Sequence, residues 1–131
     1  MLRVKTFIQQ SKIHGTGLFA AQRIEKGEVT WVFDPEFDVS FTKDQVARMT
    51  PLGQEFFWKY CYFDKEIEKF VLCADDQRFI NHTSRNPNIS STPRQDTATR
   101  VILAGEEMLC DYEAFEAGYF RRRNLVEQFE S

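Results

Sequence analysis

The segment Arg78-Phe79-Ile80-Asn81-His82-Thr83 places a short apolar pair and an Asn-His pair in an otherwise polar stretch of the chain. Pro87-Asn88 follows within the same stretch. Asn and His side chains in polar loops often bond nearby backbone groups, so this segment alone predicts a structural loop. Its interpretation changes when it is placed beside three other segments of the sequence.

Two of these segments precede it and one follows it. The first, Ser11 to Ala20, contains Gly15-Thr16-Gly17, and the second is the turn Ile24 to Glu28. The third, Ala104 to Tyr112, ends with Asp111-Tyr112. The glycines of the first segment predict a tight turn whose backbone can approach a ligand closely.

The run Gly15 to Ala20 also fits GxGxxA, a form of the dinucleotide-binding fingerprint. That fingerprint must open a helix within a βαβ unit, and Lys26-Gly27 would end such a helix within about two turns. The rest of the chain does not alternate strands and helices. Dinucleotide binding is therefore disfavoured, and a test of NAD binding would decide between the two interpretations.

Short strands and turns dominate the predicted secondary structure, so the expected fold class is mostly β with α insertions. Thr42 to Gln45 forms a capping box and Thr50-Pro51 a second helix start, which predicts two helices within residues 42–59. An amphipathic helix is expected over residues 117–129. Strands are expected over residues 3–8, 18–21, 29–33, 60–64, 70–74, 97–103 and 108–112.

Taken in order, the four segments resemble the SET domain, the fold of S-adenosylmethionine-dependent protein lysine methyltransferases. The resemblance covers about residues 3–115 of a single domain expected over residues 1–131, with a helical insertion at about 42–59 and a helical tail at about 116–131. It implies several small β-sheets around a pseudoknot-like crossing, and a C-terminal helix. Cysteine clusters are absent from the sequence, so the chain resembles short bacterial or viral members without flanking zinc modules, and no metal site is expected.

The resemblance also implies a cofactor, S-adenosylmethionine, and a set of site residues. Tyr112 would be catalytic, orienting the amine or the sulfonium, and Asn81 would supply both a donor and an acceptor to the cofactor. An aromatic channel would admit the lysine from the opposite side, because aromatic walls suit its apolar stem and cationic head. The implied cofactor-binding residues are His14, Gly15, Thr16, Gly17, Phe79, Asn81 and His82, and the implied channel residues are Tyr60, Tyr62 and Phe115.

Two expectations concern the channel. The spacing of Tyr60 and Tyr62 predicts that both lie on one face of a strand. The attacking amine must be neutral, and deprotonating a free lysine at pH 7 costs about 4.6 kcal/mol. Burial in an apolar channel and a nearby sulfonium would both disfavour the ammonium, so no dedicated general base is required and none is evident.

The composition of the chain argues against several classes of function. The 17 basic and 20 acidic side chains give a formal net charge of −3, which argues against an electrostatically driven nucleic-acid binder. No apolar run approaches the roughly 18 residues of a membrane helix, and residues 1–10 lack the apolar region of a signal peptide, so a cytoplasmic protein is expected. The three cysteines are expected to be buried thiols, and Arg121-Arg122-Arg123 a solvated helix face.

The expected function is methyl transfer from S-adenosylmethionine to a lysine side chain of a protein partner, without direct contact to nucleic acid or membrane. Two alternatives stay open. The first is a non-catalytic module of the same fold that binds a protein or peptide, which cofactor binding without methyl transfer would favour. The second is a methyltransferase acting on a small amine or another residue type, which competition between free lysine and protein would identify. The 13 Phe residues are compatible with a dimer, but no segment locates its face.

Overall fold

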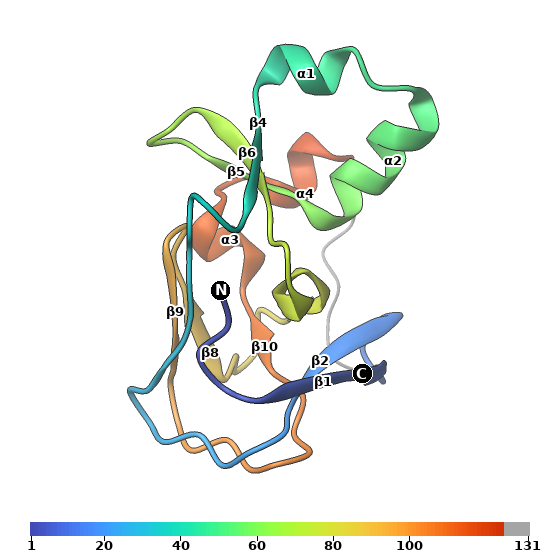
Figure 1. Cartoon of the computed structure of the whole chain (residues 1–131). Helices are drawn as coiled ribbons and strands as arrows, with labels where there is room; N and C mark the ends of the chain where they lie inside the picture. Colours follow the sequence, from blue (N-terminus) through green and yellow to red (C-terminus); the bar gives the residue numbers. More distant parts are fainter. Residues whose placement is uncertain (125–131) are drawn as a thin grey trace.

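The computed structural model describes residues 1–124 as small β-sheets with short helices between them. Helices α1 and α2 lie at one end of the molecule, and the β1–β2 hairpin lies toward the other (Figure 1). The strands are β1 (Thr6–Gln10), β2 (Thr16–Ala20), β3 (Val29–Val32), β4 (Val39–Phe41), β5 (Tyr62–Asp64), β6 (Lys69–Leu72), β7 (Asn81–His82), β8 (Ile89–Ser91), β9 (Gln95–Ala98) and β10 (Leu109–Cys110). The helices are α1 (Lys43–Ala47), α2 (Pro51–Tyr60), the 3₁₀ helix η1 (Asp76–Phe79), α3 (Tyr112–Phe115) and α4 (Tyr119–Arg122).

The strands form three sheets. One is the β1–β2 hairpin, a second has the order β4-β6-β5, and the largest has the order β3-β9-β8-β10-β7. The late strand β10 lies between β7 and β8 and runs parallel to both, with Leu109 opposite Asn81 and Cys110 opposite both His82 and Ile89. Strand β10 is therefore inserted between β7 and β8, two strands that are consecutive in sequence. This arrangement confirms the expected fold class and brings the Asn-His pair beside the residues that lead into Tyr112.

Both predicted helix starts in the middle of the chain are confirmed. The Gln45 amide donates to Thr42 Oγ1 at 3.1 Å, and the Thr42 amide donates to Gln45 Oε1 at 2.8 Å, which completes the capping box. The Gly53 amide donates to Thr50 Oγ1 at 3.1 Å, with Pro51 as the first residue of α2. These local bonds fix where α2 begins, and its far end borders the site described below.

The predicted strand over 60–64 begins too early. Tyr60 is the last residue of α2 and Tyr62 the first of β5, so the two tyrosines do not share a strand face. The helix continues because Phe57 is buried, the Cys61 amide donates to the Phe57 carbonyl at 2.9 Å, and Phe56 packs on Tyr60 one turn later. The alternation of Tyr60 and Tyr62 is typical of a strand, but here Tyr60 completes the last turn of α2.

The structure also corrects the strand and the helix that were predicted near the C-terminus. The strand expected over 108–112 ends at Cys110, because Asp111 caps α3 by accepting from the Glu113 amide at 3.0 Å. The helix expected over 117–129 begins only after Gly118, whose φ of 80° breaks the chain direction, and α4 ends at Arg122. Residues 125–129 of that expected helix lie outside the described residues.

Other strand boundaries shift by a few residues. The first strand begins at Thr6 rather than at residue 3, since the Arg3 amide donates instead to the Thr30 carbonyl. The strand expected over 97–103 is β9, which ends at Ala98, and Ile102 makes an isolated bridge to Ile24. Buried apolar residues from these segments form the main core, including Leu18, Ile24, Ile89, Ile102 and Met108. All three cysteines are free and buried, as expected.

Candidate active site

An open groove of about 940 Å³ runs between α2, the η1–β7 segment and the C-terminal segment. Residues of the turn before β2 also line it. Five of the predicted cofactor-binding residues lie in this lining, namely His14, Gly15, Thr16, Phe79 and Asn81. The structure thus brings together residues that are up to 67 positions apart in the sequence. Gly17 and His82 are not part of the lining and have other positions, described below.

Asn81 ties the turn before β2 to the segment before β10. Its Nδ2 donates to the His14 carbonyl at 2.8 Å, to Glu107 Oε2 at 3.0 Å and, more weakly, to the Thr16 carbonyl at 3.4 Å. Ser11 Oγ donates to the same Glu107 carboxylate at 2.8 Å. One amide group therefore joins the turn before β2 to Glu107, and together with Ser11 it holds the turn in its place beside the groove.

The two glycines of the turn have different roles. Gly15 has a φ of +47°, a left-handed conformation that other residues adopt with strain, and it lines the groove. Gly17 instead packs against Glu107, and a Cβ there would overlap the Glu107 Oε2 atom. Close packing against Glu107, rather than a place in the groove lining, therefore explains why residue 17 is a glycine.

His82 lies beneath the groove. His82 is 1% exposed, and its ring packs on Tyr112 and Phe120, with ring centroids 5.1 and 4.7 Å away. The Tyr112 amide donates to His82 Nδ1 at 3.0 Å. In this position His82 orients the first residue of α3.

Tyr112 occupies the junction between the groove and a second cavity, since it lines both. Its hydroxyl donates to the Ile80 carbonyl, and its backbone amide is held by His82. Burial raises the pKa of the Tyr112 hydroxyl well above its usual value, so the group is protonated at all ordinary pH values. The side chain is thus a fixed neutral hydroxyl at the wall shared by the two cavities.

The second cavity is narrow, about 50 Å³, and six aromatic side chains contribute to its walls. All three predicted channel residues line it: Tyr60 from the end of α2, Tyr62 from β5 and Phe115 from α3. Phe115 packs on Tyr62 and Tyr112, with centroid distances of 5.3 and 5.6 Å. The Tyr62 hydroxyl donates to the Pro93 carbonyl at 2.6 Å, which fixes the ring as a wall.

One end of the narrow cavity is polar, which no motif in the sequence predicts. Asp96, from β9, is 2% exposed and lines the cavity together with Gln77 and Ser91. Ser91 Oγ donates to Asp96 Oδ1 at 2.7 Å, and Gln77 Nε2 donates to Asp96 Oδ2 at 2.6 Å. Burial raises the pKa of the Asp96 carboxyl to about 7, although the two donors oppose the shift.

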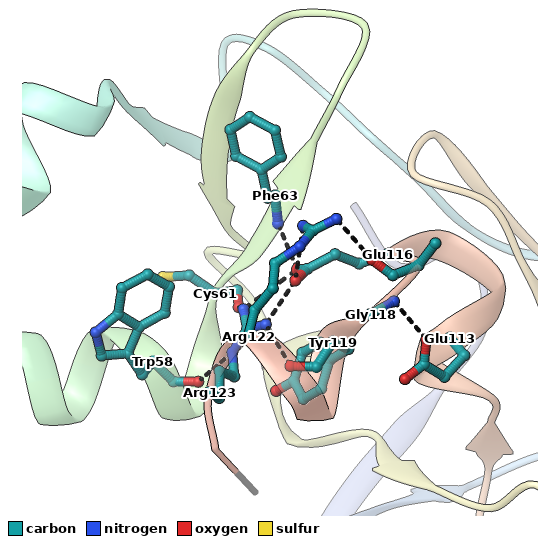
Figure 2. A network of polar contacts seen from close by, with 10 residues as sticks. Trp58, Cys61, Phe63, Glu113, Glu116, Gly118, Tyr119, Arg122 and Arg123 are labelled. Atoms are coloured by element: carbon teal, nitrogen blue, oxygen red, sulfur yellow. Dashed lines mark hydrogen bonds and ion pairs between the residues drawn. The ribbon is translucent and has the colours of Figure 1, made fainter.

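The C-terminal segment is fastened to the site by a buried ion pair. The side chains of Glu116 and Arg123 are each 2% exposed, with Nη1–Oε2 and Nη2–Oε1 distances of 2.5 and 3.2 Å. The other Arg123 donors reach the carbonyls of Trp58, Cys61 and Tyr119 at 2.9–3.2 Å. Figure 2 shows the pair meeting between α2, the start of β5 and α4.

Glu116 and Arg123 therefore join the two walls of the narrow cavity. Glu116 Oε1 also accepts from the Phe63 amide at 2.7 Å, next to the wall residue Tyr62. The Arg123 guanidinium lies 3.7 Å from the Tyr119 ring centroid, and Tyr119 lines both cavities. The expectation of a solvated Arg121-Arg122-Arg123 face is wrong for Arg123, because α4 ends at Arg122 and the side chain of its C-cap residue Arg123 packs inward onto Glu116.

Neither a metal site nor a membrane-spanning helix is present in the part of the chain that the structure describes. No group of three or more His, Cys, Asp or Glu side chains in residues 1–124 is placed to hold a metal ion. In that same part, no helix has the length and apolar character needed to cross a lipid bilayer.

The sequence model of the SET domain matches residues 15–113. Solved structures with a similar fold include an apo form of Polycomb Repressive Complex 2 from Chaetomium thermophilum, with a TM-score of 0.68 and 25% identity over 92% of this chain and 16% of that chain. An inhibitor-bound humanized mutant of the same complex gives a TM-score of 0.64 and 25% identity over 90% of this chain and 16% of that one.

A third similar structure is the complex in an autoinhibited conformation bound to S-adenosylmethionine. Its TM-score is 0.64, with 24% identity over 92% of this chain and 16% of that chain. At this identity the likeness concerns the fold. This chain spans about one sixth of the length of the chains it matches.

Proposed function

The chain belongs to the SET domain family, and on this premise we propose that it is an S-adenosylmethionine-dependent methyltransferase acting on a lysine side chain of a protein. The observation that carries the proposal is that two unlike cavities adjoin along a shared wall. The open groove and the narrow cavity have six lining residues in common: Lys59, Tyr60, Arg78, Ile80, Tyr112 and Tyr119. A methyl donor in the groove and an amine in the narrow cavity would meet at the Tyr112 hydroxyl.

The chemistry of the groove lining suits this cofactor. The rings of Phe79 and Phe120 offer apolar faces to a flat base, and Lys59 and Arg78 offer positive charge to a carboxylate. Gly15 leaves the turn before β2 open, since nothing lies within 4 Å of its missing Cβ. The S-adenosylmethionine in the third similar structure belongs to that complex, and we extend it to this chain as part of the proposal.

S-adenosylmethionine, when bound, supplies a methyl group on a positively charged sulfur. The chain's own residues position the acceptor. Tyr62, Phe115 and Tyr119 enclose the apolar stem of a lysine and exclude water from it, and the aromatic faces favour its cationic head. The Tyr112 hydroxyl, held by Ile80 and protonated, presents its oxygen at the shared wall. Alignment of this kind removes much of the entropic barrier to reaction.

The direct test of the proposal is methyl transfer. The purified full chain is incubated with S-adenosylmethionine carrying an isotopically labelled methyl group and with a mixture of lysine-rich proteins, and the proteins are then hydrolysed to amino acids. Label in methyl-lysine supports the proposal. Bound cofactor without label in any amino acid would instead favour a non-catalytic module that binds a protein or peptide, and label in another amino acid would move the proposal to a different acceptor.

Replacing Asn81 with Ala is expected to weaken S-adenosylmethionine binding by tenfold or more. The substitution removes the Nδ2 donor that joins His14, Thr16 and Glu107, and a lost buried hydrogen-bonding group of this kind costs about 1–3 kcal/mol. The measurement is a calorimetric titration of the folded variant with the cofactor.

A matched control is Asn88→Ala. Asn88 is also a buried asparagine that ties together backbone next to β10, donating to the Glu107 carbonyl and accepting from the Leu109 amide, but it does not line the groove. We expect the control to lose stability and to keep its cofactor affinity within a few-fold. Equal losses of cofactor affinity in the two variants would contradict a specific role of Asn81 in cofactor binding.

A further inference from the structure

The polar end of the narrow cavity is built from three buried side chains on three different segments. Asp96 comes from β9, Gln77 from η1 and Trp31 from β3, and all three line the cavity. Both Asp96 oxygens already accept a hydrogen bond, from Ser91 and from Gln77. These two bonds fix the orientation of the Asp96 carboxyl in the wall of the narrow cavity.

One atom at this end indicates that a hydrogen-bond donor binds there. Gln77 is 5% exposed, yet its Oε1, an acceptor, has no hydrogen-bond partner among residues 1–124. Buried polar atoms without partners are uncommon in folded proteins and destabilise them unless a ligand or water satisfies them. An amine entering the cavity would offer N–H donors to Gln77 Oε1 and to Asp96.

Contrary to the expectation from the sequence that no dedicated base is required, we propose that Asp96 accepts the proton which the substrate lysine must lose before it can be methylated, an inference that rests on the proposed function. One N–H bond of the lysine ammonium breaks, its electron pair stays on nitrogen, and an O–H bond forms on the Asp96 carboxylate. The nitrogen pair then forms the new N–C bond while the C–S bond of the donor breaks and its pair stays on sulfur. The product is a methylammonium, and the Asp96 proton passes to solvent when the product leaves.

The environment of Asp96 suits this role. In an apolar cavity a neutral amine beside a neutral carboxyl is favoured over a buried pair of charges, because both ions lose their hydration. The pKa of the Asp96 carboxyl, raised by burial to about 7, lets the carboxylate form at neutral pH while still binding a proton well. The cavity lining also includes Cys110, whose thiol pKa is raised by burial, with Asp96 adding to the shift.

Other titratable groups line the same cavity. Burial raises the pKa of six of them, so these stay neutral where Asp96 titrates: Cys61 after α2, Tyr62 of β5, Cys73 after β6, Cys110 of β10, Tyr112 of α3 and Tyr119 of α4. Tyr60 of α2 belongs to the same lining. Lys59 and Arg78 complete the charged part of the lining and contribute positive charge.

The variants for the test are Asp96→Asn and Ser91→Ala. Asparagine has the shape of aspartate, can accept from Ser91, and can donate to Gln77 Oε1 if the Gln77 amide turns over, so the variant has partners for its polar atoms. In the wild type we expect the methylation rate to rise with pH through about 7 as Asp96 ionises. Asp96→Asn should lack this rise and be at least tenfold slower at pH 8. Ser91→Ala removes a donor to the carboxylate and should move the rise to higher pH.

A second readout needs neither cofactor nor turnover. The carboxyl carbon of Asp96, identified by its disappearance in Asp96→Asn, is followed by NMR in labelled full-length protein. At pH 8 we expect N-acetyl-lysine methylamide to move this resonance toward its protonated position, and the norleucine analogue, which lacks the amine, to leave it unchanged. The proposal is overturned if the methylation rate of Asp96→Asn keeps the wild-type pH profile. It is also overturned if N-acetyl-lysine methylamide leaves the Asp96 resonance unchanged. A wild type that binds the probe through Asp96 but transfers no methyl group would refute the proposed function instead.

Discussion

Replacing Tyr112 with Phe lowers methyl transfer by about 100-fold or more while cofactor affinity stays within a few-fold, if the shared wall of the two cavities is the reaction site. The substitution removes one fixed hydroxyl and keeps the ring that packs on His82, Phe115 and Tyr119. Loss of a single preorganised polar group at a reacting centre costs about 100- to 1,000-fold in turnover. The measurement is the single-turnover rate at saturating cofactor.

The matched control for this variant is Tyr62→Phe. Tyr62 also lines the narrow cavity, but its hydroxyl donates to the Pro93 carbonyl, and Tyr62 does not line the groove. Its loss should change turnover by less than about tenfold, since it removes one neutral hydrogen bond of about 1 kcal/mol. Equal effects of the two variants would mean that a general loosening of the aromatic walls, rather than the Tyr112 hydroxyl, determines the rate.

Replacing Arg123 with Met is expected to lower the free energy of unfolding by about 3–5 kcal/mol. The variant leaves the Glu116 carboxylate buried without its cation, which is among the most destabilising changes a single substitution makes. It also releases three backbone carbonyls, those of Trp58, Cys61 and Tyr119. Urea denaturation followed by circular dichroism gives the free energy.

Two further variants identify the cause of that loss. Arg121→Met lies on the same short helix, but Arg121 is exposed, and the change should fall within about 0.5 kcal/mol. The double variant Glu116→Gln with Arg123→Met removes both charges and should recover a large part of the stability. If the single Arg123 variant were as stable as the wild type, the ion pair would not be what fastens α4 to the end of α2.

The order of short motifs was enough to predict the fold and much of the candidate site. The glycine turn, the Asn-His pair and Asp111-Tyr112 each specify local chemistry, and the structure brings Gly15, Asn81 and Tyr112 to one groove. The capping box at Thr42 was predictable for a similar reason, since its bonds lie within four consecutive residues. Features encoded by nearby residues could therefore be inferred from the sequence.

Features that depend on partners far away in the sequence could not be inferred in this way. Asp96 is one of 20 acidic residues, and only the folding of η1 and β8 around it reveals a buried carboxyl. Arg123 belongs to a run of three arginines, and its burial depends on carbonyls more than 60 residues away. Tyr60 and Tyr62 alternate as strand residues do, but burial of Phe57 extends the helix through Tyr60. Tertiary packing outweighed local pattern in each case.

The most direct measurement is a calorimetric titration of the purified chain with S-adenosylmethionine, because both the groove assignment and methyl transfer require that the cofactor binds. We expect saturable one-to-one binding in the micromolar range, weakened at least tenfold in Asn81→Ala and kept within a few-fold in Tyr112→Phe. Absence of binding to a folded wild-type chain, both alone and with a lysine-rich protein added, would contradict the assignment of the open groove as a cofactor site and leave the chain as a binding module with the SET fold.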